Sequence, residues 1–393
     1  MSSTDKKKTI VVVGATGRQG GSVARTFLSS PVSSRWRVRC ITRNPSSEAA
    51  RGLAALGADI VQADLSSLPS LVSAFSGAHA IYVNTDFWEV YRGALSSGKA
   101  TDAEVSQLAY DTEVARGKNA ALAASQTAGL ERYIYSAFGS MKVASGGKYA
   151  RCYHIEAKAA VVSYIVSELP DLDSRTSYIY ASGYCDNALL YPHKVPLGTL
   201  WVLWVVAKLP FLVHLLPRPG VKKSEQTEKK NANKNENNRN QVSGGDDGGG
   251  NRWYHLHHRH QYLMMLPGRI STSLPTFIPH VSTGGYVRCL VEDEEAGTKL
   301  LAVDWWLSME QGLSAWEKVT NRKARFLQMP VWLLCRITGV REEVMEGGAF
   351  LTEFPYMCDV TDWIEPKHLK NPPPVAMTWE EYLRSRDIKE LLE

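Results

Sequence analysis

Three glycines near the start of the chain have the spacing of a phosphate-binding turn. Gly14, Gly17 and Gly20 follow the β-branched run Thr9–Val13, and a helical pattern begins near Gln19. Glycines at such a junction allow a tight turn and a close approach of the backbone to a pyrophosphate, which then meets the free N–H groups of the helix. Because the triplet lies between a strand and a helix, it predicts a dinucleotide site rather than a turn without a ligand.

The end of the next predicted strand indicates which dinucleotide is bound. In sites for NAD(H), this strand usually ends in an acidic residue that accepts a hydrogen bond from the ribose 2′-hydroxyl. Here Arg37–Thr42 is followed by Arg43 and then by residues 44–47, with no carboxylate in reach. An arginine fork and small polar donors suit a 2′-phosphate, and Arg18 in the glycine turn could add a second cation. NADP(H) is therefore the expected cofactor, the alternative being that Arg43 is only a solvated arginine at a strand end.

A third polar position follows the predicted strand Asp59–Gln62. Asp64 would accept a hydrogen bond from the adenine amino group, or it would instead cap a helix that begins near Leu68. The residues alone do not distinguish these two roles.

A parallel sheet is needed to bring these residues together. Residues 9–180 alternate short apolar runs with helix-like stretches, which is typical of strands joined by crossover helices. Strands are expected at Thr9–Val13, Arg37–Thr42, Asp59–Gln62, Ala80–Val83, Tyr133–Ser136 and Thr176–Tyr180, and helices at Gly20–Leu28, Ser47–Leu56, Ser70–Phe75, Ala103–Ala128 and Glu156–Glu168. The expected fold is α/β, a Rossmann-type doubly wound parallel sheet that binds its ligand at the carboxyl ends of the strands.

The α/β pattern stops near Pro196. Leu197–Pro217 is strongly apolar and has the length of a membrane span, but Lys208 and Pro210 lie inside it, and a central Lys costs roughly 3 kcal/mol on insertion. Residues 218–251 are rich in Lys, Asn, Glu and Gly without hydrophobic periodicity, and we expect them to be disordered. The apolar run is open to three interpretations: a membrane or partner-binding helix, a packed extra element, or translated sequence outside the fold such as an unspliced intron. The last is favoured because the pattern of a folded domain resumes near Leu263.

Three parts are therefore expected along the chain. Residues 9–197 would form the cofactor domain, residues 198–262 an insertion outside the core, and residues 263–393 a smaller lobe for a substrate or a partner. The net charge of +5 lies wholly within the insertion, so no basic face for nucleic acid is expected on the rest. Six cysteines without CxxC spacing and the absence of a secretory signal indicate a reduced protein of the cytoplasm or nucleus. The histidines between His255 and His260 lie in the insertion, and no metal is expected.

Several strings of the sequence resemble the NmrA-like family, atypical short-chain-dehydrogenase folds named for a fungal regulator of nitrogen metabolite repression. The similar strings are VVVGATGRQGGSVARTFL, ITRNPSS, GADIVQADL, DFWE and YIYSAF, then, more weakly, LPTFIPHVSTGGYVRCLVED and TWEEYL. The resemblance covers roughly residues 9–197 and, more weakly, 263–393.

The resemblance also implies which residues surround NADP(H). They are Gly14, Ala15, Thr16, Gly17, Arg18, Gln19 and Gly20 at the pyrophosphate; Arg43, Asn44, Pro45, Ser46 and Ser47 at the 2′-phosphate; Asp64 and Leu65 at the adenine; Thr85, Asp86, Phe87 and Lys158 on the ribose and nicotinamide side; and Tyr184, Cys185, Asp186 and Asn187 in the nicotinamide pocket. In the last run the family more often shows an aromatic residue and a glutamate where Cys185 and Asp186 stand.

Conventional short-chain dehydrogenases use a Tyr-x-x-x-Lys pair for proton transfer. The corresponding residues here are His154 and Lys158, which the spacing places on one face of a helix. Histidine can exchange protons near neutral pH. The interpretation that we favour, however, is that His154 only packs near the cofactor entrance. Ser136, at the end of the fifth strand, could help to orient a carbonyl.

Two functions follow from these residues. The missing tyrosine favours an NADP(H)-occupied redox sensor that regulates a partner, such as a transcription factor in nitrogen metabolite control, without binding nucleic acid or a membrane itself. The retained Lys158 supports the alternative, an NADP-dependent oxidoreductase of a small carbonyl or unsaturated metabolite, similar to isoflavone-reductase-like proteins. The sequence favours the sensor.

Overall fold

The computed structural model describes residues 7–98, 101–196 and 260–392. Its centre is an eight-stranded sheet of order β14-β11-β6-β5-β4-β1-β2-β3, in which every pairing is parallel. The strands are β1 (Lys8–Val13), β2 (Trp36–Thr42), β3 (Asp59–Gln62), β4 (Ala80–Val83), β5 (Arg132–Ala137), β6 (Thr176–Ala181), β11 (Lys299–Ala302) and β14 (Trp363–Ile364). The expected Rossmann-type α/β fold is therefore confirmed.

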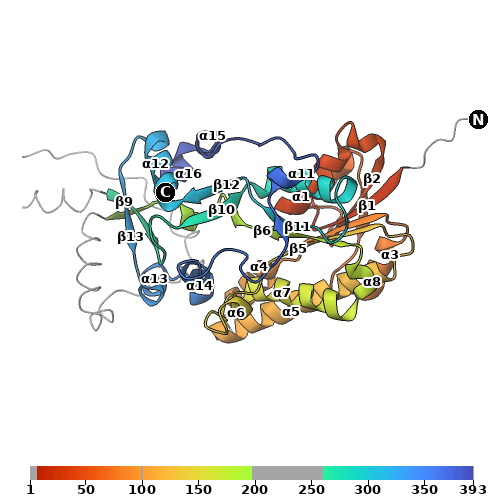
Figure 1. Cartoon of the computed structure of the whole chain (residues 1–393), viewed down its shortest axis with the longest axis horizontal. Helices are drawn as coiled ribbons and strands as arrows, with labels where there is room; N and C mark the ends of the chain where they lie inside the picture. The colour runs from red at the N-terminus through yellow and green to blue at the C-terminus, as the bar shows by residue number, and fades with distance from the viewer. Residues whose placement is uncertain (1–6, 99–100, 197–259, 393) are drawn as a thin grey trace, which may run out of the picture.

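Helices cover both faces of this sheet (Figure 1). One face packs against α1 (Arg18–Leu28), α2 (Glu48–Ala55) and α11 (Pro279–Glu292), and the other against α3 (Leu68–Phe75), α5 (Asp102–Ser125), α7 (Tyr153–Glu168) and α8 (Pro170–Asp173). Alternate residues of β1 serve the two cores, since Ile10 and Val12 belong to the first and Val11 and Val13 to the second. A strand that is covered on both faces must be apolar throughout, which explains why β1 reads as a continuous apolar run.

The contact between α1 and α11 joins the beginning of the chain to its C-terminal third. A Cβ atom on Gly284 would lie 2.1 Å from Thr26 Oγ1 and 2.5 Å from the carbonyl oxygen of Ser22, so only glycine allows this approach. The N–H of Gly284 donates to Ser22 Oγ at 2.9 Å. Helix α11 thereby holds α1 in place against the sheet.

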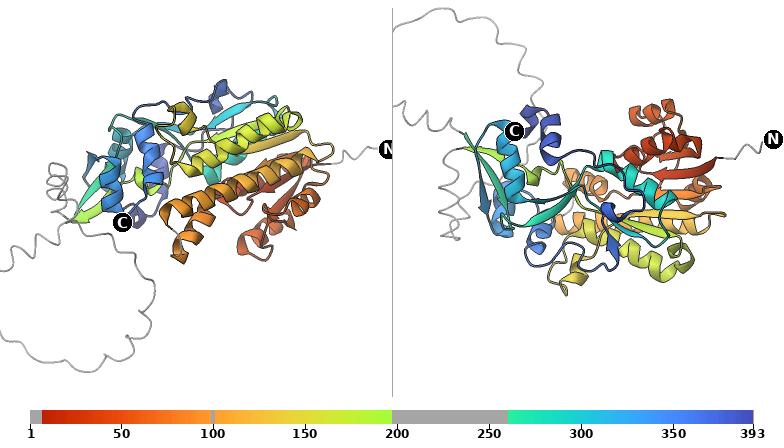
Figure 2. Two further views of the ribbon diagram at one scale, coloured as in Figure 1. Left: turned by 90° about the horizontal axis from the view of Figure 1, so that it is seen from below. Right: turned by 45° about the horizontal axis from the view of Figure 1, so that its top comes forward.

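A smaller lobe lies at one end of the large sheet (Figure 2). It contains two three-stranded sheets, β12-β10-β7 and β13-β9-β8. Their strands are β7 (Gly183–Tyr184), β8 (His193–Pro196), β9 (His260–Leu266), β10 (Ser273–Phe277), β12 (Trp305–Ser308) and β13 (Ala324–Gln328), with helices α12 (Met309–Thr320), α13 (Val331–Thr338), α14 (Glu342–Phe350), α15 (Trp379–Ser385) and α16 (Ile388–Leu392).

The division expected near residues 197 and 263 does not follow this architecture. Strands β7 and β8 come before residue 197 but belong to the smaller lobe, whereas α11, β11 and β14 come after residue 263 but complete the large sheet. The chain crosses between the two lobes several times, because a parallel sheet gains strands wherever a crossover returns to it.

Strands β8 and β9 flank the expected insertion and pair directly. Pro196 is opposite His260, and Lys194 is opposite Tyr262, in an antiparallel ladder. Residues 260–262 therefore belong to β9. The predicted end of the insertion at residue 262 is three residues too late. The apolar run Leu197–Pro217, the tract 218–251 and the histidines before His260 lie outside the described residues.

Two findings concern the described ranges alone. None of their helices combines the length and the apolar composition that a membrane span requires. Within the same ranges, no group of three or more His, Cys, Asp or Glu side chains is placed to hold a metal ion.

Candidate functional site

The turn between β1 and α1 depends on its glycines. Gly14 has a φ of 72°, which L side chains rarely adopt. The N–H of Gly17 donates to the carbonyl oxygen of Gly14 at 2.9 Å. A Cβ atom on Gly20 would lie 2.2 Å from that same oxygen. The backbone therefore folds back on itself where only glycine fits, and α1 begins at the carboxyl end of β1.

The N-terminus of α1 is open to an anion. Its N-cap is Gly17, no side chain of the described residues caps it, and its first turn has no acidic residue. The N–H groups of a first turn have no acceptor within the helix and carry its positive dipole end. β1 lies between β2 and β4, where the strand order reverses direction. Doubly wound sheets bind nucleotides at this switch point, so the predicted pyrophosphate site at residues 14–20 has suitable geometry.

The side chain of Gln19 points into the protein. Its Oε1 accepts hydrogen bonds from Tyr82 at 2.7 Å and from Ser136 at 3.0 Å, and its Nε2 donates to Tyr184 Oη at 2.7 Å. Burial raises the pKa of Tyr82 well above its usual value, so this phenol remains a donor. The amide of Gln19 thus links α1 to β4, β5 and β7. Ser136, expected near a carbonyl, is committed to Gln19.

Arg43 lies exposed after β2, as expected, but it has an acidic partner. It forms an ion pair with Glu89 in the first turn of α4 (Phe87–Ser97), and Arg116 of α5 contacts the other carboxylate oxygen at 3.2 Å. The expectation that no carboxylate is in reach was wrong, because the fold supplies one from a distant segment. Partial burial favours a higher pKa for Glu89, but hydrogen bonds and charge from the two arginines outweigh it and lower this pKa.

The loop after Arg43 organises itself through its small polar residues. Asn44 Oδ1 accepts from the N–H of Ser46 at 3.0 Å, and Ser47 caps α2 by accepting from the N–H of Ala50 at 3.3 Å. Asn44 and Ser46 are exposed, while Pro45 and Ser47 are half-buried. The predicted 2′-phosphate residues 43–47 therefore form one accessible loop.

Asp64 closes a turn after β3. Its Oδ1 accepts from the N–H of Ser66 at 2.7 Å, and this hydrogen bond is the main cause of a lowered Asp64 pKa. The N-cap of α3 is Ser67, so the alternative in which Asp64 caps this helix was wrong. Leu65 is half-buried beside it, and its carbonyl oxygen accepts from Asn119 at 2.9 Å. The adenine contact stays a prediction.

Lys158 is buried at the carboxyl end of β4. Its Nζ donates to the carbonyl oxygen and the Oγ1 of Thr85, both at 3.0 Å, and to Asn84 Oδ1 at 3.2 Å. It lies 3.1 Å from Glu113 Oε1 of α5, and the exposed side-chain fractions of Lys158 and Glu113 are 9% and 0%. Thr85 donates its hydroxyl to the same carboxylate oxygen.

The sequence analysis missed Asn84 and Glu113. Glu113 lies four residues after Ala109 and seven before Ala120, which are both fully buried, so it occupies the apolar face of α5. A carboxylate at a core position of a helix is the signal that could have revealed it. Its Oε2 has no hydrogen-bond partner among the described residues. A buried ion pair adds little to stability, and its place at the ligand edge of the sheet is therefore a functional indication.

His154 lies where α7 meets the smaller lobe. Its Nδ1 is 3.8 Å from Glu343 Oε1 of α14, and neither atom has a hydrogen-bond partner among the described residues. Ser106 donates to the other oxygen of Glu343 at 2.6 Å. The imidazole ring is 4.9 Å from the ring of Trp88 and 6.0 Å from that of Phe87. His154 thus packs against aromatic rings, as favoured, and it also has an acidic neighbour, Glu343, that the sequence did not indicate.

Residues 85–87 form the end of β4 and the start of α4. Thr85 is buried against Lys158, and Asp86 caps α4 by accepting from the N–H of Trp88 at 2.8 Å. Phe87 is buried and stacks on Tyr91 with ring centroids 5.5 Å apart. Of the three predicted residues, only Asp86 is exposed.

The run after β6 is divided between the two lobes. Tyr184 binds Gln19, and Asp186 accepts from Arg18 at 2.6 Å, so both face the start of α1. Asn187 instead caps a short 3-10 turn, η2 (Ala188–Leu190). Cys185 is fully buried in the core of the smaller lobe, where burial raises the pKa of its thiol to about 11. Its side chain therefore packs inside that core, and the predicted contact with the nicotinamide stays a prediction.

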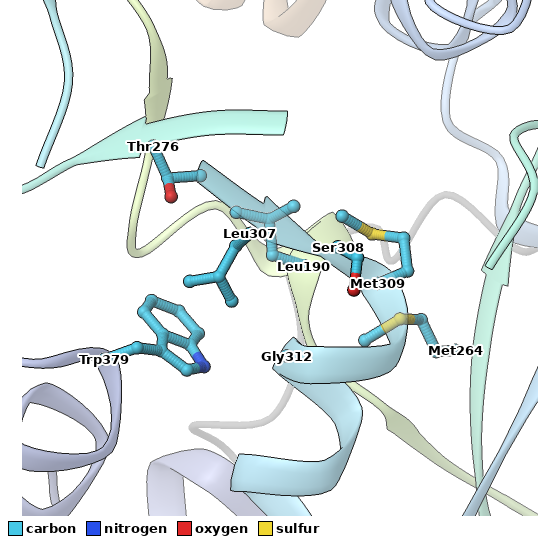
Figure 3. A pocket seen from close by; sticks show the side chains of 8 residues that line it. All are labelled: Leu190, Met264, Thr276, Leu307, Ser308, Met309, Gly312 and Trp379. Atoms are coloured by element: carbon cyan, nitrogen blue, oxygen red, sulfur yellow. The ribbon is translucent and has the colours of Figure 1, made fainter. Parts of the chain in front are cut away.

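The smaller lobe contains a small hollow. It is lined by Leu190, Met264, Thr276, Leu307, Ser308, Met309, Gly312 and Trp379 (Figure 3). The volume of this hollow is only about 10 Å³. This is room for about one water molecule, so the hollow is a packing defect rather than a substrate site.

Comparison with known proteins agrees with this geometry. The model of the NmrA-like family matches residues 6–195. An NmrA-like family domain-containing oxidoreductase of Aspergillus sp. (strain MF297-2) is 51% identical over 84 residues, which are 21% of this chain and 24% of that protein. Another, of Aspergillus hancockii, is 33% identical over 181 residues, 46% of this chain and 48% of its own. The chain thus spans less than half of the length of these relatives.

Solved structures extend the likeness to the whole fold. The negative transcriptional regulator NmrA in complex with NADP has a TM-score of 0.56 and 20% identity, covering 96% of this chain and 94% of its own. Isoflavone reductase has a TM-score of 0.56 and 11% identity, covering 97% and 99%. At such identities the likeness concerns the fold alone. Over residues 6–195, the chain matches the NmrA-like family.

Proposed function

We propose that the chain binds NADP(H) at the carboxyl edge of its large sheet and acts as an NADP(H)-dependent oxidoreductase on a small carbonyl or unsaturated compound. The observation that carries the proposal is the start of α1, an uncapped helix end behind a turn that only glycines can form. Its N–H groups need acceptors, and a pyrophosphate at the switch point of the sheet supplies them.

The choice of NADP(H) rests on Arg43. Its guanidinium lies beyond β2, where a 2′-phosphate would accept paired hydrogen bonds from it. Among the structural neighbours, NmrA has been solved both with NADP and with NAD. The backbone of residues 18–20 would hold the pyrophosphate, and the loop at residues 43–47 would hold the 2′-phosphate.

The choice of an oxidoreductase rests on Lys158 and on the relatives that carry this name. Bound NADPH supplies a hydride from its nicotinamide ring. Asn84, Thr85 and Glu113 hold the Lys158 ammonium rigidly at the carboxyl end of β4. A fixed positive charge in a dry site stabilises negative charge that develops on a substrate oxygen.

A proton donor is also needed, and His154 is the candidate. The Glu343 carboxylate, 3.8 Å from Nδ1, is too far away for a hydrogen bond but favours a proton on that nitrogen, and Nε2 would then be the atom that exchanges a proton. The histidine would then take the part that the tyrosine has in conventional short-chain dehydrogenases.

A second candidate function is the sensor, and one observation favours it. The Lys158 ammonium has three protons, and four oxygens of the protein already surround it. A lysine held in this way can stabilise a nucleotide site without taking part in turnover. The chain would then report the NADPH/NADP⁺ ratio to a protein partner, such as a transcription factor in nitrogen control, in the cytoplasm or nucleus.

NADPH fluorescence distinguishes the two functions. We expect NADPH to bind with a change in its emission and to be oxidised when one member of a panel of aldehydes, ketones and enones is added. Binding without oxidation across the whole panel would instead support the sensor. If neither NADPH nor NADP⁺ produces heat in calorimetry or a shift in thermal unfolding, both functions are excluded.

A variant without the buried ion pair links turnover to this site. The double substitution Glu113→Gln and Lys158→Met removes both charges together, so that neither is left buried alone. We expect it to bind NADPH within about tenfold of the unchanged chain and to lose at least about a hundredfold in kcat, the smaller end of what a positioned catalytic charge contributes. Unchanged turnover would show that Lys158 has no catalytic part.

A further inference from the structure

The ion pair between Arg43 and Glu89 crosses the predicted nucleotide site. Arg43 follows β2 and Glu89 lies in the first turn of α4, which follows β4. β2 and β4 are the two neighbours of β1 in the sheet. The pair therefore spans the carboxyl end of β1, next to the glycine turn at which a dinucleotide would enter.

Glu89 remains anchored when Arg43 leaves it. Its second oxygen is 3.2 Å from Arg116 Nη1, and the side chain of Arg116 is 15% exposed, against 54% for Arg43. Arg116 is itself positioned by Ser66, whose Oγ is 3.3 Å from its Nε. One arginine is thus a fixed support for the carboxylate, and the other is an exposed group that can turn to a ligand.

Arg43 has more negatively charged neighbours than a site that binds only a 2′-phosphate would be expected to have. Glu89, Asp64 and Asp86 all act on Arg43 electrostatically, and Arg116 is the other cation of the group. Two positive and three negative charges leave the group formally negative. A 2′-phosphate must therefore displace Glu89 from Arg43, whereas a 2′-hydroxyl needs an acceptor and would find one in Glu89.

We propose that Glu89 sets the nucleotide preference of this site: it competes with a 2′-phosphate for Arg43 and accepts a hydrogen bond from a 2′-hydroxyl, so that the chain binds both NADP(H) and NAD(H). This inference rests on the proposed nucleotide binding and adds the residue that decides between the two nucleotides. Glu89 of α4 would thereby take the role of the acidic residue that ends the second strand in NAD(H) sites and that is absent after β2.

Calorimetric titration with NADP⁺ and with NAD⁺ tests the role of Glu89. Glu89→Gln keeps the size of the side chain and removes its charge. We expect it to bind NADP⁺ about two- to fivefold more tightly, which is the strength of an exposed ion pair, and NAD⁺ more weakly. The ratio of the two dissociation constants should thus shift by about fivefold or more toward NADP⁺.

Two further variants make the test specific. In a chain that already carries Arg43→Gln, the substitution Glu89→Gln should no longer tighten NADP⁺, because the competition is for Arg43. Glu131→Gln removes a similarly exposed partner of Lys8 at the opposite edge of the sheet and should change neither dissociation constant.

The outcomes separate this inference from the proposed function. If the unchanged chain binds both nucleotides but Glu89→Gln leaves their ratio unchanged, or tightens NADP⁺ equally without Arg43, the role of Glu89 is refuted and nucleotide binding stands. If the unchanged chain binds neither nucleotide, the proposed function fails, and the inference fails with it.

Discussion

Each cation that the sequence places at the site has an acidic partner from a distant part of the chain. Arg18 meets Asp186, Arg43 meets Glu89 and Lys158 meets Glu113. The first two pairs are exposed enough for solvent and ligands to compete, so they cost little to open. The third is buried, and removing one partner would leave an uncompensated charge in the core.

Glu113→Gln should therefore destabilise the chain strongly. It leaves the Lys158 ammonium buried without a counter-charge, and we expect the free energy of unfolding to fall by about 3 kcal/mol. The double substitution with Lys158→Met should recover most of this loss, because both charges are then absent. Urea unfolding of the single and double variants measures the difference.

Glu131→Gln is the matched control for an exposed pair, with an expected loss of at most about 1 kcal/mol. A loss for Glu113→Gln no larger than this control would contradict the buried ion pair.

At the scale of elements, sequence patterns predicted the strands of the large sheet that have a local hydrophobic pattern. Strands β1 to β6 lie within one residue of their expected ends. Helix α4 was missed, and only Phe87 and Tyr91 of its residues are buried. The strands of the smaller lobe were missed, and they pair with partners far along the chain, as β7 does with β10.

The same limit applies to the site residues. The glycine turn, Arg43 and Lys158 follow strands or fall in a recognisable spacing, and the sequence could indicate them. Glu89 and Glu113 approach them from helices, and only the packing of those helices on the sheet places the carboxylates there. Charge partners that tertiary structure brings together leave no local pattern.

The turn before α1 gives a prediction about an element. Gly20→Ala places a Cβ where 2.2 Å separates it from the carbonyl oxygen of Gly14, so the turn must open. We expect at least about a tenfold loss of NADPH affinity, the equivalent of about 1.4 kcal/mol, together with a lower melting temperature. Gly52→Ala in α2 is the control, since nothing lies within 4 Å of its Cβ. That variant should gain about 0.5–1 kcal/mol in stability and keep its affinity. Equal affinity in both variants would show that the Gly14–Gly20 contact is not needed for binding.

At the scale of the molecule, the smaller lobe contributes residues to the predicted site. Asp186 reaches the start of α1, and Glu343 of α14 reaches His154 on α7. Ser106 of α5 donates to the same Glu343, so the lobe is attached on the side where α5 and α7 pack together. Movement of the lobe would therefore shift the partners of both Arg18 and His154.

The pairing of β8 with β9 predicts how much of the chain this architecture needs. Pro196 and His260 are opposite each other, so a two-residue Asn-Gly turn can replace residues 197–259 and close a hairpin. We expect this shortened chain to fold with an unchanged melting temperature and to bind NADPH with unchanged affinity, as thermal unfolding and calorimetry would measure. Removing residues 198–262 instead should be harmful, because Gln261 and Tyr262 then leave β9. Tyr262 packs against the buried Trp316 with ring centroids 5.1 Å apart. If the first deletion also unfolds the chain, residues 197–259 are part of the folded structure and the interpretation as an insertion is wrong.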